Sequence, residues 1–177
     1  MRVLMAMGAV ALMLVGALLA FAATRPDAFR VEREVVIAAP AEKVYALIED
    51  FRAWPSWSPW EKLDPGMKRT YEGPARGAGA VYAWDGDRNV GAGRMEITEA
   101  APPSRIALKL DFSRPFEGHN VAVFTLEPRG DATRVTWSMT GPSRFIAKVI
   151  QTVVSMDRMV GNNFETGLAN LKAVAER

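Results

Sequence analysis

Hydrophobic and polar side chains alternate along most of the chain between residues 29 and 140. In the stretch from Phe29 to Ala38, Val31, Val35 and Ile37 fall on one side, and charged residues dominate the other. Alternation with a period of two is typical of a strand that buries one face. The pattern predicts a first strand at 29–38 and six more at 68–72, 80–85, 91–99, 105–112, 119–127 and 132–140.

Short turn-forming segments separate the last six predicted strands. Four of the five connections contain the Gly, Pro, Asn and Asp residues expected of hairpin turns, and these four lie at 73–79, 86–89, 101–104 and 128–131. Strands joined by such short connections pair with their neighbours in antiparallel order. The sequence therefore predicts a six-stranded meander, and a seven-stranded antiparallel sheet when the first strand is included.

Two short helical segments are predicted between the first and second strands. Residues 41–51 carry apolar side chains at helical spacing, and Pro40 is expected to be the first residue of this helix because it lacks an amide hydrogen. Trp54, Trp57 and Trp60 follow at three-residue spacing between prolines, which suits a short helical turn better than a strand. We expect these tryptophans to pack the second helix against the sheet. The alternatives are a cavity mouth and a membrane interface.

The last segment, Arg144 to Arg177, is predicted to be a long helix with one apolar face. The natural partner of this face is the inner side of the sheet, which gives an α+β fold with the element order β-α-α-β6-α. We expect Phe164 and Leu168 to face the sheet and Trp137 to approach them from its strand. The apolar face consists of Ile146, Val149, Ile150, Val153, Met156, Val160, Phe164, Leu168, Leu171 and Ala175.

The N-terminal segment differs from the rest of the sequence. Val3 to Ala23 is a run of 21 residues without a charge, close to the roughly 20 residues that cross a bilayer. We expect residues 1–24 to form an uncleaved single-pass membrane anchor, with a cleaved signal peptide as the alternative. Residues 25–28 are a short linker, and 29–177 are one folded domain, expected on the extracytoplasmic side.

Composition excludes several functional classes. The chain has 22 Lys and Arg against 20 Asp and Glu, so it lacks the strongly basic balance that is usual in nucleic acid binding. It has no cysteine, which excludes disulfides, thiol catalysis and thiolate metal sites. The single histidine, His119, excludes a zinc site with several histidines. We predict no metal site, no cofactor and no catalytic residue set, and the oligomeric state stays open.

Three stretches carry a resemblance to a known family. They are Val35 to Tyr45 (VVIAAPAEKVY), Trp54 to Trp60 (WPSWSPW) and Gly130 to Trp137 (GDATRVTW). With the element order, they resemble the START-like (SRPBCC) superfamily, and its polyketide cyclase/dehydrase and lipid-transport-like branch in particular. The resemblance implies a helix-grip fold, in which the sheet wraps around the C-terminal helix and encloses a hydrophobic cavity. Members include lipid carriers, plant hormone binders, polyketide cyclases and hydrolases, so the resemblance implies apolar ligands more than one reaction.

The cavity residues are predicted from the inward faces of the strands and helices. Methionines suit an adaptable apolar wall, and Asn163 is the polar residue of the last helix most suited to orient a ligand headgroup. The candidate cavity residues are Trp57, Trp60, Tyr82, Met95, Leu110, Phe124, Trp137, Met139, Met156, Val160, Asn163 and Phe164.

Other conspicuous residues have simpler interpretations. The glycine-rich loop from Gly73 to Gly79 precedes a strand, whereas phosphate-binding loops usually open onto a helix, so we interpret it as a hairpin connection. Glu96 and Asp111 fall on the polar side of their strands and should face solvent. His119 should be an exposed residue near the start of a strand.

Three functions remain open from the sequence. The first is a membrane-anchored module that binds or transports a lipid or another hydrophobic small molecule. The second is a polyketide cyclase/dehydrase-like or hydrolase-like enzyme acting on an apolar or aromatic substrate, with Tyr45, Tyr71, Tyr82 and the carboxylates as available acid-base groups. The third is an interaction domain with a filled core.

Overall fold

The computed structural model describes residues 2–143, 145, 148–149 and 156–177. The predicted strands are all present, with ends that shift by about two residues at most. The helices are α1 (Arg2–Ala23), α2 (Ala41–Glu49), η1 (Phe51–Ser56), α3 (Trp60–Leu63) and α5 (Met156–Ala175). The strands are β1 (Ala28–Ile37), β2 (Lys68–Glu72), β3 (Val81–Asp85), β4 (Ala92–Ala101), β5 (Arg105–Arg114), β6 (Gly118–Arg129) and β7 (Ala132–Pro142).

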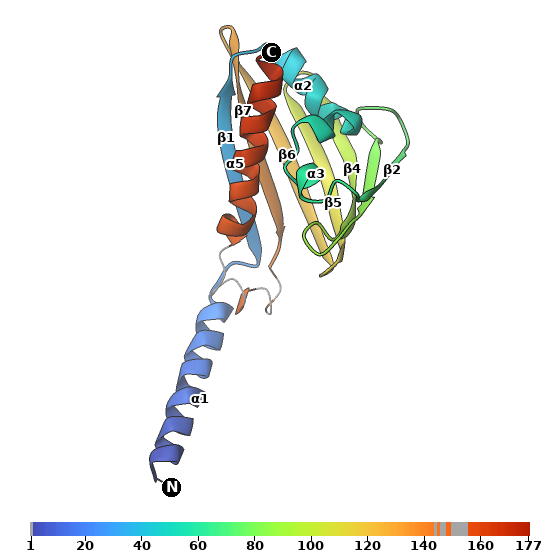
Figure 1. Cartoon of the computed structure of the whole chain (residues 1–177). Coiled ribbons are helices and arrows are strands. Elements are labelled where there is room, and N and C mark those ends of the chain that lie inside the picture. Colours follow the sequence, from blue (N-terminus) through green and yellow to red (C-terminus); the bar gives the residue numbers. More distant parts are fainter. Residues whose placement is uncertain (1, 144, 146–147, 150–155) are drawn as a thin grey trace.

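The strands form one antiparallel sheet in the order β1-β7-β6-β5-β4-β3-β2. Six strands follow the chain as a meander, and β1 joins the edge of the sheet beside the last of them. Figure 1 shows α5 lying along β1 and β7, while α2, η1 and α3 lie in front of the other strands. The predicted α+β helix-grip fold is confirmed. Pro40 is the N-cap of α2 and not its first residue, a difference of one position.

The core lies between the sheet and these helices. Phe164 of α5 is 2 % exposed and stacks on Trp137 of β7, with ring centroids 4.0 Å apart. Leu168, one turn later, is also buried. The predicted contact of the last helix with the sheet is therefore confirmed. The start of that predicted helix, residues 144–155, lies largely outside the described residues.

An ion-pair cluster fixes the outer side of α5 to β1. The Arg33 guanidinium donates to both carboxylate oxygens of Asp157, at 2.8 and 2.9 Å, and to Glu165 at 2.6 Å. Gly161 lies under this side chain, and a Cβ there would overlap with the guanidinium. Two acids about two turns apart on α5 thus bind one arginine of β1. Their hydrogen bonds raise the pKa of Arg33, and the pKa of Asp157 lies below its ordinary value.

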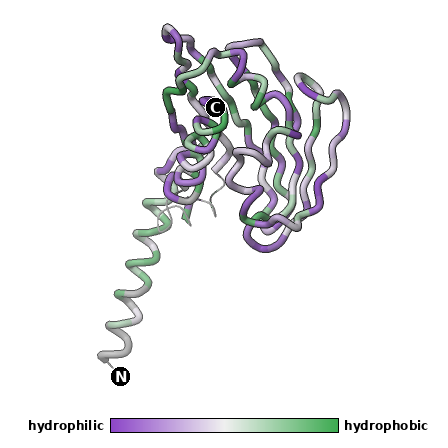
Figure 2. The backbone as a smooth tube through the Cα atoms, turned by 45° about the horizontal axis from the view of Figure 1, so that its top comes forward, coloured by the Kyte–Doolittle hydropathy of each residue, from purple (hydrophilic) through white to green (hydrophobic). Residues whose placement is uncertain are grey.

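Helix α1 extends away from the domain (Figure 1), and hydrophobic colouring follows much of its length in Figure 2. The structure describes the side chains of residues 7, 8, 10 and 12–23 of this helix. Large apolar side chains among them are exposed to solvent, for example Leu12 at 74 % and Phe21 at 54 %. Within the described residues, no helix is both long and apolar enough to span a bilayer. The predicted membrane anchor is therefore not supported by the structure.

Replacing Asp157 by Asn should reduce stability, and the loss should depend on pH. Arg33 holds the pKa of Asp157 below its ordinary value of 3.8 in the folded state, so the contribution of this pair is present above that value. It disappears as the pH falls through the lowered pKa. Denaturant unfolding from pH 7 to pH 3 should therefore show a difference between wild type and Asp157→Asn that narrows toward pH 3.

The matched control is Asp131→Asn, because Asp131 is exposed in the turn between β6 and β7. It should follow the wild-type pH profile. An Asp157→Asn profile that runs parallel to wild type down to pH 3 would contradict the assigned role of the ion pair.

Candidate functional site

A cavity of about 380 Å³ lies between the sheet, α5 and the segment that contains η1 and α3. This volume falls within the range of small-molecule sites. Most of the wall is apolar and aromatic. The lining residues are Trp54, Ser58, Trp60, Glu61, Met67, Tyr82, Trp84, Arg88, Asn89, Val90, Gly91, Met95, Leu108, Leu110, Phe112, Arg114, Pro115, Ala122, Trp137, Met139, Val160, Asn163 and Phe164.

The strand register builds the floor of the cavity. Tyr82 of β3 pairs with Met95 of β4, which pairs with Leu110 of β5. Paired residues in an antiparallel sheet point to the same face, so these three side chains form one row across the inner face. Each is less than 10 % exposed, although each borders the cavity. The row is thus part of an enclosed apolar surface.

A second row lies nearer the mouth, where Trp84 and Phe112 flank Gly93. The two rings meet edge to face with centroids 5.7 Å apart. A Cβ at Gly93 would lie 2.6 Å from the Trp84 ring, too close for an ordinary contact. Glycine at this position therefore lets the indole lie across the sheet and form the cavity wall.

The tryptophan segment covers the opposite side. Trp54 donates its indole N–H to the carbonyl of Ile48, and Trp57 donates to that of Leu47, both at 3.0 Å. These bonds attach the segment to the C-terminal end of α2. Trp60 packs edge-on against Trp137 and Phe164. The expected packing of the second helical segment against the sheet is confirmed by the contacts of Trp57 and Trp60 with Trp137 of β7, and Trp54 and Trp60 also line the cavity.

A buried charged cluster lies in the mainly apolar wall, which also includes Arg88 and Arg114. The Glu61 side chain is 4 % exposed, and its Oε1 accepts a hydrogen bond from the Tyr82 hydroxyl at 2.7 Å. Its Oε2 accepts one from Arg69 Nε, also at 2.7 Å. Arg69 additionally donates to the carbonyl of Met67. Glu61 is therefore a buried carboxylate whose charge is balanced by one arginine.

Burial and the hydrogen bond to Glu61 both raise the pKa of Tyr82. The hydroxyl therefore stays protonated at neutral pH and acts as a hydrogen-bond donor. Among the residues the structure describes, no cluster of three or more Asp, Glu or His side chains is arranged to hold a metal ion. The Tyr82 hydroxyl and the Glu61 carboxylate thus form a hydrogen-bonded donor and acceptor pair at the cavity wall.

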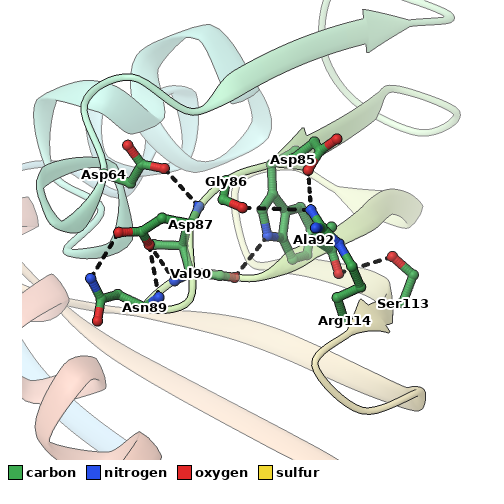
Figure 3. A network of polar contacts seen from close by, with 10 residues as sticks. Asp64, Asp85, Gly86, Asp87, Asn89, Val90, Ala92, Ser113 and Arg114 are labelled. Carbon is green, nitrogen blue, oxygen red and sulfur yellow. Dashed lines mark hydrogen bonds and ion pairs between the residues drawn. The ribbon is translucent and has the colours of Figure 1, made fainter.

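The mouth is formed by the loop between β3 and β4, shown in Figure 3. Asp64 accepts a hydrogen bond from the amide of Asp87 at 2.9 Å, and Asp87 in turn caps the amide of Asn89 at 2.7 Å. Trp84 donates to the carbonyl of Val90, and Arg114 pairs with Asp85. These bonds hold the rim in one conformation, so the entrance is preformed.

The structure brings most of the predicted cavity residues together. Trp60, Tyr82, Met95, Leu110, Trp137, Met139, Val160, Asn163 and Phe164 all lie on the cavity wall. Whether they contact a ligand stays a prediction.

Two predicted residues lie elsewhere, and a third lies outside the description. Phe124 is fully buried and packs between Trp54, Trp57 and Trp137, so it belongs to the filled aromatic core and not to the lining. Trp57 is also fully buried there, because its bond to Leu47 turns the indole away from the cavity. The side chain of Met156 is outside the described residues.

The remaining acid-base candidates lie away from the cavity. Asp111 and His119 pair on the outer face of the sheet at 2.7 Å, and Glu96 pairs there with Arg94. His119 is exposed, as predicted. Tyr71 packs beside Tyr82 without bordering the cavity, and Tyr45 is a buried residue of α2 that also does not border it. The loop from Gly73 to Gly79 joins β2 to β3, which confirms its hairpin interpretation.

The buried carboxylate of the cavity wall, Glu61, was missed in the sequence analysis. It lies between Trp60 and Lys62 in a four-residue helix, too short for a hydrophobic period to indicate which side is buried. Its partners Arg69 and Tyr82 are 8 and 21 residues away in the sequence. The available signal was an acid directly after three closely spaced tryptophans.

Replacing Phe164 by Ala should cost less than about 2.5 kcal/mol of unfolding free energy, because one side of the ring already borders the cavity. A ring packed on all sides would cost roughly 3 to 5 kcal/mol. Affinity for a fluorescent apolar probe should change at the same time. Denaturant unfolding with and without the probe measures both, and Leu168→Ala is the control for a fully packed neighbour. A large stability loss with unchanged probe binding would remove Phe164 from the site.

Comparisons with known proteins place the fold and the family. No curated protein matches the sequence. The solved structure of protein CV1439 from Chromobacterium violaceum is similar with a TM-score of 0.60 and 20 % identity, over 86 % of this chain and 99 % of that one. The solved structure of the Aha1 dimer from Colwellia psychrerythraea has a TM-score of 0.58 and 17 % sequence identity. The match covers 84 % of this chain and 96 % of the Aha1 chain. The solved structure of BexL, a di-domain ARO/CYC protein from the BE-7585A biosynthetic pathway, has a TM-score of 0.61 and 17 % sequence identity. The match covers 87 % of this chain and 52 % of BexL.

These identities are low and show a shared fold. The family model described as "Polyketide cyclase / dehydrase and lipid transport" matches residues 28–176, which is nearly the whole folded domain. The chain belongs to this polyketide cyclase/dehydrase and lipid transport family.

Proposed function

We propose that the domain binds one hydrophobic small molecule in the cavity between the sheet and α5. The observation that carries the proposal is the enclosed volume of about 380 Å³ with walls of Trp, Phe, Tyr, Met and Leu side chains. Transfer of an apolar ligand from water to such a surface is favourable by about 25 cal/mol per Å² buried. The preformed rim reduces the entropy lost on binding. The family description, which includes lipid transport, supports the same class of ligand.

A second candidate function is an enzyme that acts on a hydrophobic or aromatic substrate. It is favoured by Glu61 and Tyr82, which place a carboxylate and a protonated hydroxyl on the cavity wall. Such a pair can move a proton to or from a bound molecule if the reacting atom lies within hydrogen-bond reach. The similarity to BexL adds fold-level support. Turnover that Glu61→Gln abolishes, with apolar binding retained, would favour this function over binding alone.

We also propose that the apolar N-terminal segment holds the domain at a membrane, with the domain on the extracytoplasmic side. The uncharged run from Val3 to Ala23 motivates this proposal, and the large apolar side chains described in α1 are exposed. Apolar surface of this kind is costly to leave in water. A carrier domain tied to a lipid surface would exchange an apolar ligand over a short distance.

Filling the cavity should abolish binding. Leu110 belongs to the row that forms the floor, so the larger ring of Leu110→Trp should occupy the space of the ligand. Affinity for N-phenyl-1-naphthylamine, measured by saturable fluorescence after delipidation, should fall at least roughly tenfold, equivalent to about 1.4 kcal/mol.

The control is Lys109→Trp, which adds the same ring one residue earlier on the exposed outer face of β5. It should leave probe binding unchanged. Wild type that shows no saturable, displaceable binding at micromolar protein would overturn the proposed function.

The proposed membrane location of the domain can be tested without a ligand. If Val3 to Ala23 is an uncleaved anchor, protein made in cells should sediment with membranes after a high-salt wash and should keep its original N-terminus. Detergent should release it. Soluble protein with a mature N-terminus near Ala23 would instead identify a cleaved signal peptide.

A further inference from the structure

Glu61 is an unusual component of a cavity whose other walls are mainly apolar. Its carboxylate is 4 % exposed, and residue 61 belongs to the cavity lining. A buried carboxylate is strongly disfavoured unless donors satisfy its oxygens. Tyr82 and Arg69 supply such donors, one to each oxygen. The arrangement therefore holds an ion-paired hydrogen-bond acceptor at the cavity wall.

The carboxylate has acceptor capacity beyond these bonds. An ionised carboxylate offers about four lone-pair sites, and the described contacts are the Tyr82 hydroxyl at Oε1 and the Arg69 guanidinium at Oε2. Both partners are anchored, since Arg69 also binds the Met67 carbonyl and Tyr82 is 4 % exposed. A further donor from a bound molecule could approach Glu61 from the cavity without displacing either partner.

The charge balance defines which donor fits. Arg69 already neutralises Glu61, so a cationic group in the cavity would lose its hydration without a free counter-charge. A ligand carboxylate placed beside Glu61 would be repelled, and it could only accept hydrogen bonds. A neutral hydroxyl donates one hydrogen bond and carries no charge to desolvate. It is therefore the group that this part of the wall favours.

We propose that the cavity selects apolar molecules that carry a neutral hydroxyl at their buried end, and that this hydroxyl donates to the Glu61 carboxylate. The proposal rests on the proposed function and specifies its ligand class. Glu61 acts as the specificity-determining contact, while the Met, Leu and aromatic walls provide affinity. A site built to accept from a hydroxyl discriminates strongly against the analogue without one.

The test compares two ligands of nearly equal shape, 2-naphthol and 2-methylnaphthalene, by titration calorimetry at pH 7. The methyl compound is the more hydrophobic, so a purely apolar cavity would bind it more tightly. Wild type should instead prefer 2-naphthol by roughly tenfold or more, as expected for a hydrogen bond to a charged acceptor. In Glu61→Leu the preference should disappear or reverse.

Glu99→Leu is the matched variant, because it makes the same substitution at an exposed carboxylate that does not line the cavity. It should keep the preference for 2-naphthol. Glu61→Gln, which keeps the side-chain shape, serves if Glu61→Leu does not fold, and it should reduce the preference at least roughly threefold. A wild type without the preference, or a Glu61 variant that keeps it in full, would overturn the inference. Saturable N-phenyl-1-naphthylamine binding in that case would leave the proposed function intact, whereas no binding of any of the three compounds would overturn both.

Discussion

The contact between one helix and a seven-stranded sheet determines the rest of the structure. A single helix is too narrow to cover the inner face of so wide a sheet. Helix α5 covers β1 and β7, where Phe164 stacks on Trp137 and Arg33 binds two acids of the helix. The strands farther from α5 need another cover, which α2 and the tryptophan segment provide. The cavity is the space that these two covers leave over β3, β4 and β5.

The same arrangement divides the space between the sheet and the helices into a packed core and an open cavity. Trp57 and Phe124 close the aromatic core beside Trp137, and both are fully buried. On the other side of that boundary, Tyr82 and Leu110 face space that no side chain occupies. Native cores rarely contain voids of this size, because empty space forfeits packing energy. A cavity that combines such a void with a paired, buried carboxylate is better explained by a ligand than by imperfect packing.

The sequence predicted the fold well and the site in part, for a physical reason. A strand that buries one face must alternate, so β1 to β7 and the inward position of Met95 follow from local pattern. Glu61 has no such pattern, because its burial depends on Arg69 and Tyr82, which only the folded chain brings near. Trp57 and Trp60 illustrate the same limit. Equal spacing along the chain did not reveal that one indole would close the core and the other line the cavity.

The most direct test of the account is a crystal structure of the protein with 2-bromonaphthalene, located by the anomalous signal of bromine. The account predicts one principal bromine site inside the cavity, within contact distance of the row formed by Tyr82, Met95 and Leu110. Loss of that bromine site in Leu110→Trp, the cavity-filling variant, would show that the bromine and the introduced ring occupy the same cavity. Bromine found only on the outer face of the sheet or along α1, with the cavity closed by rearranged side chains, would contradict it.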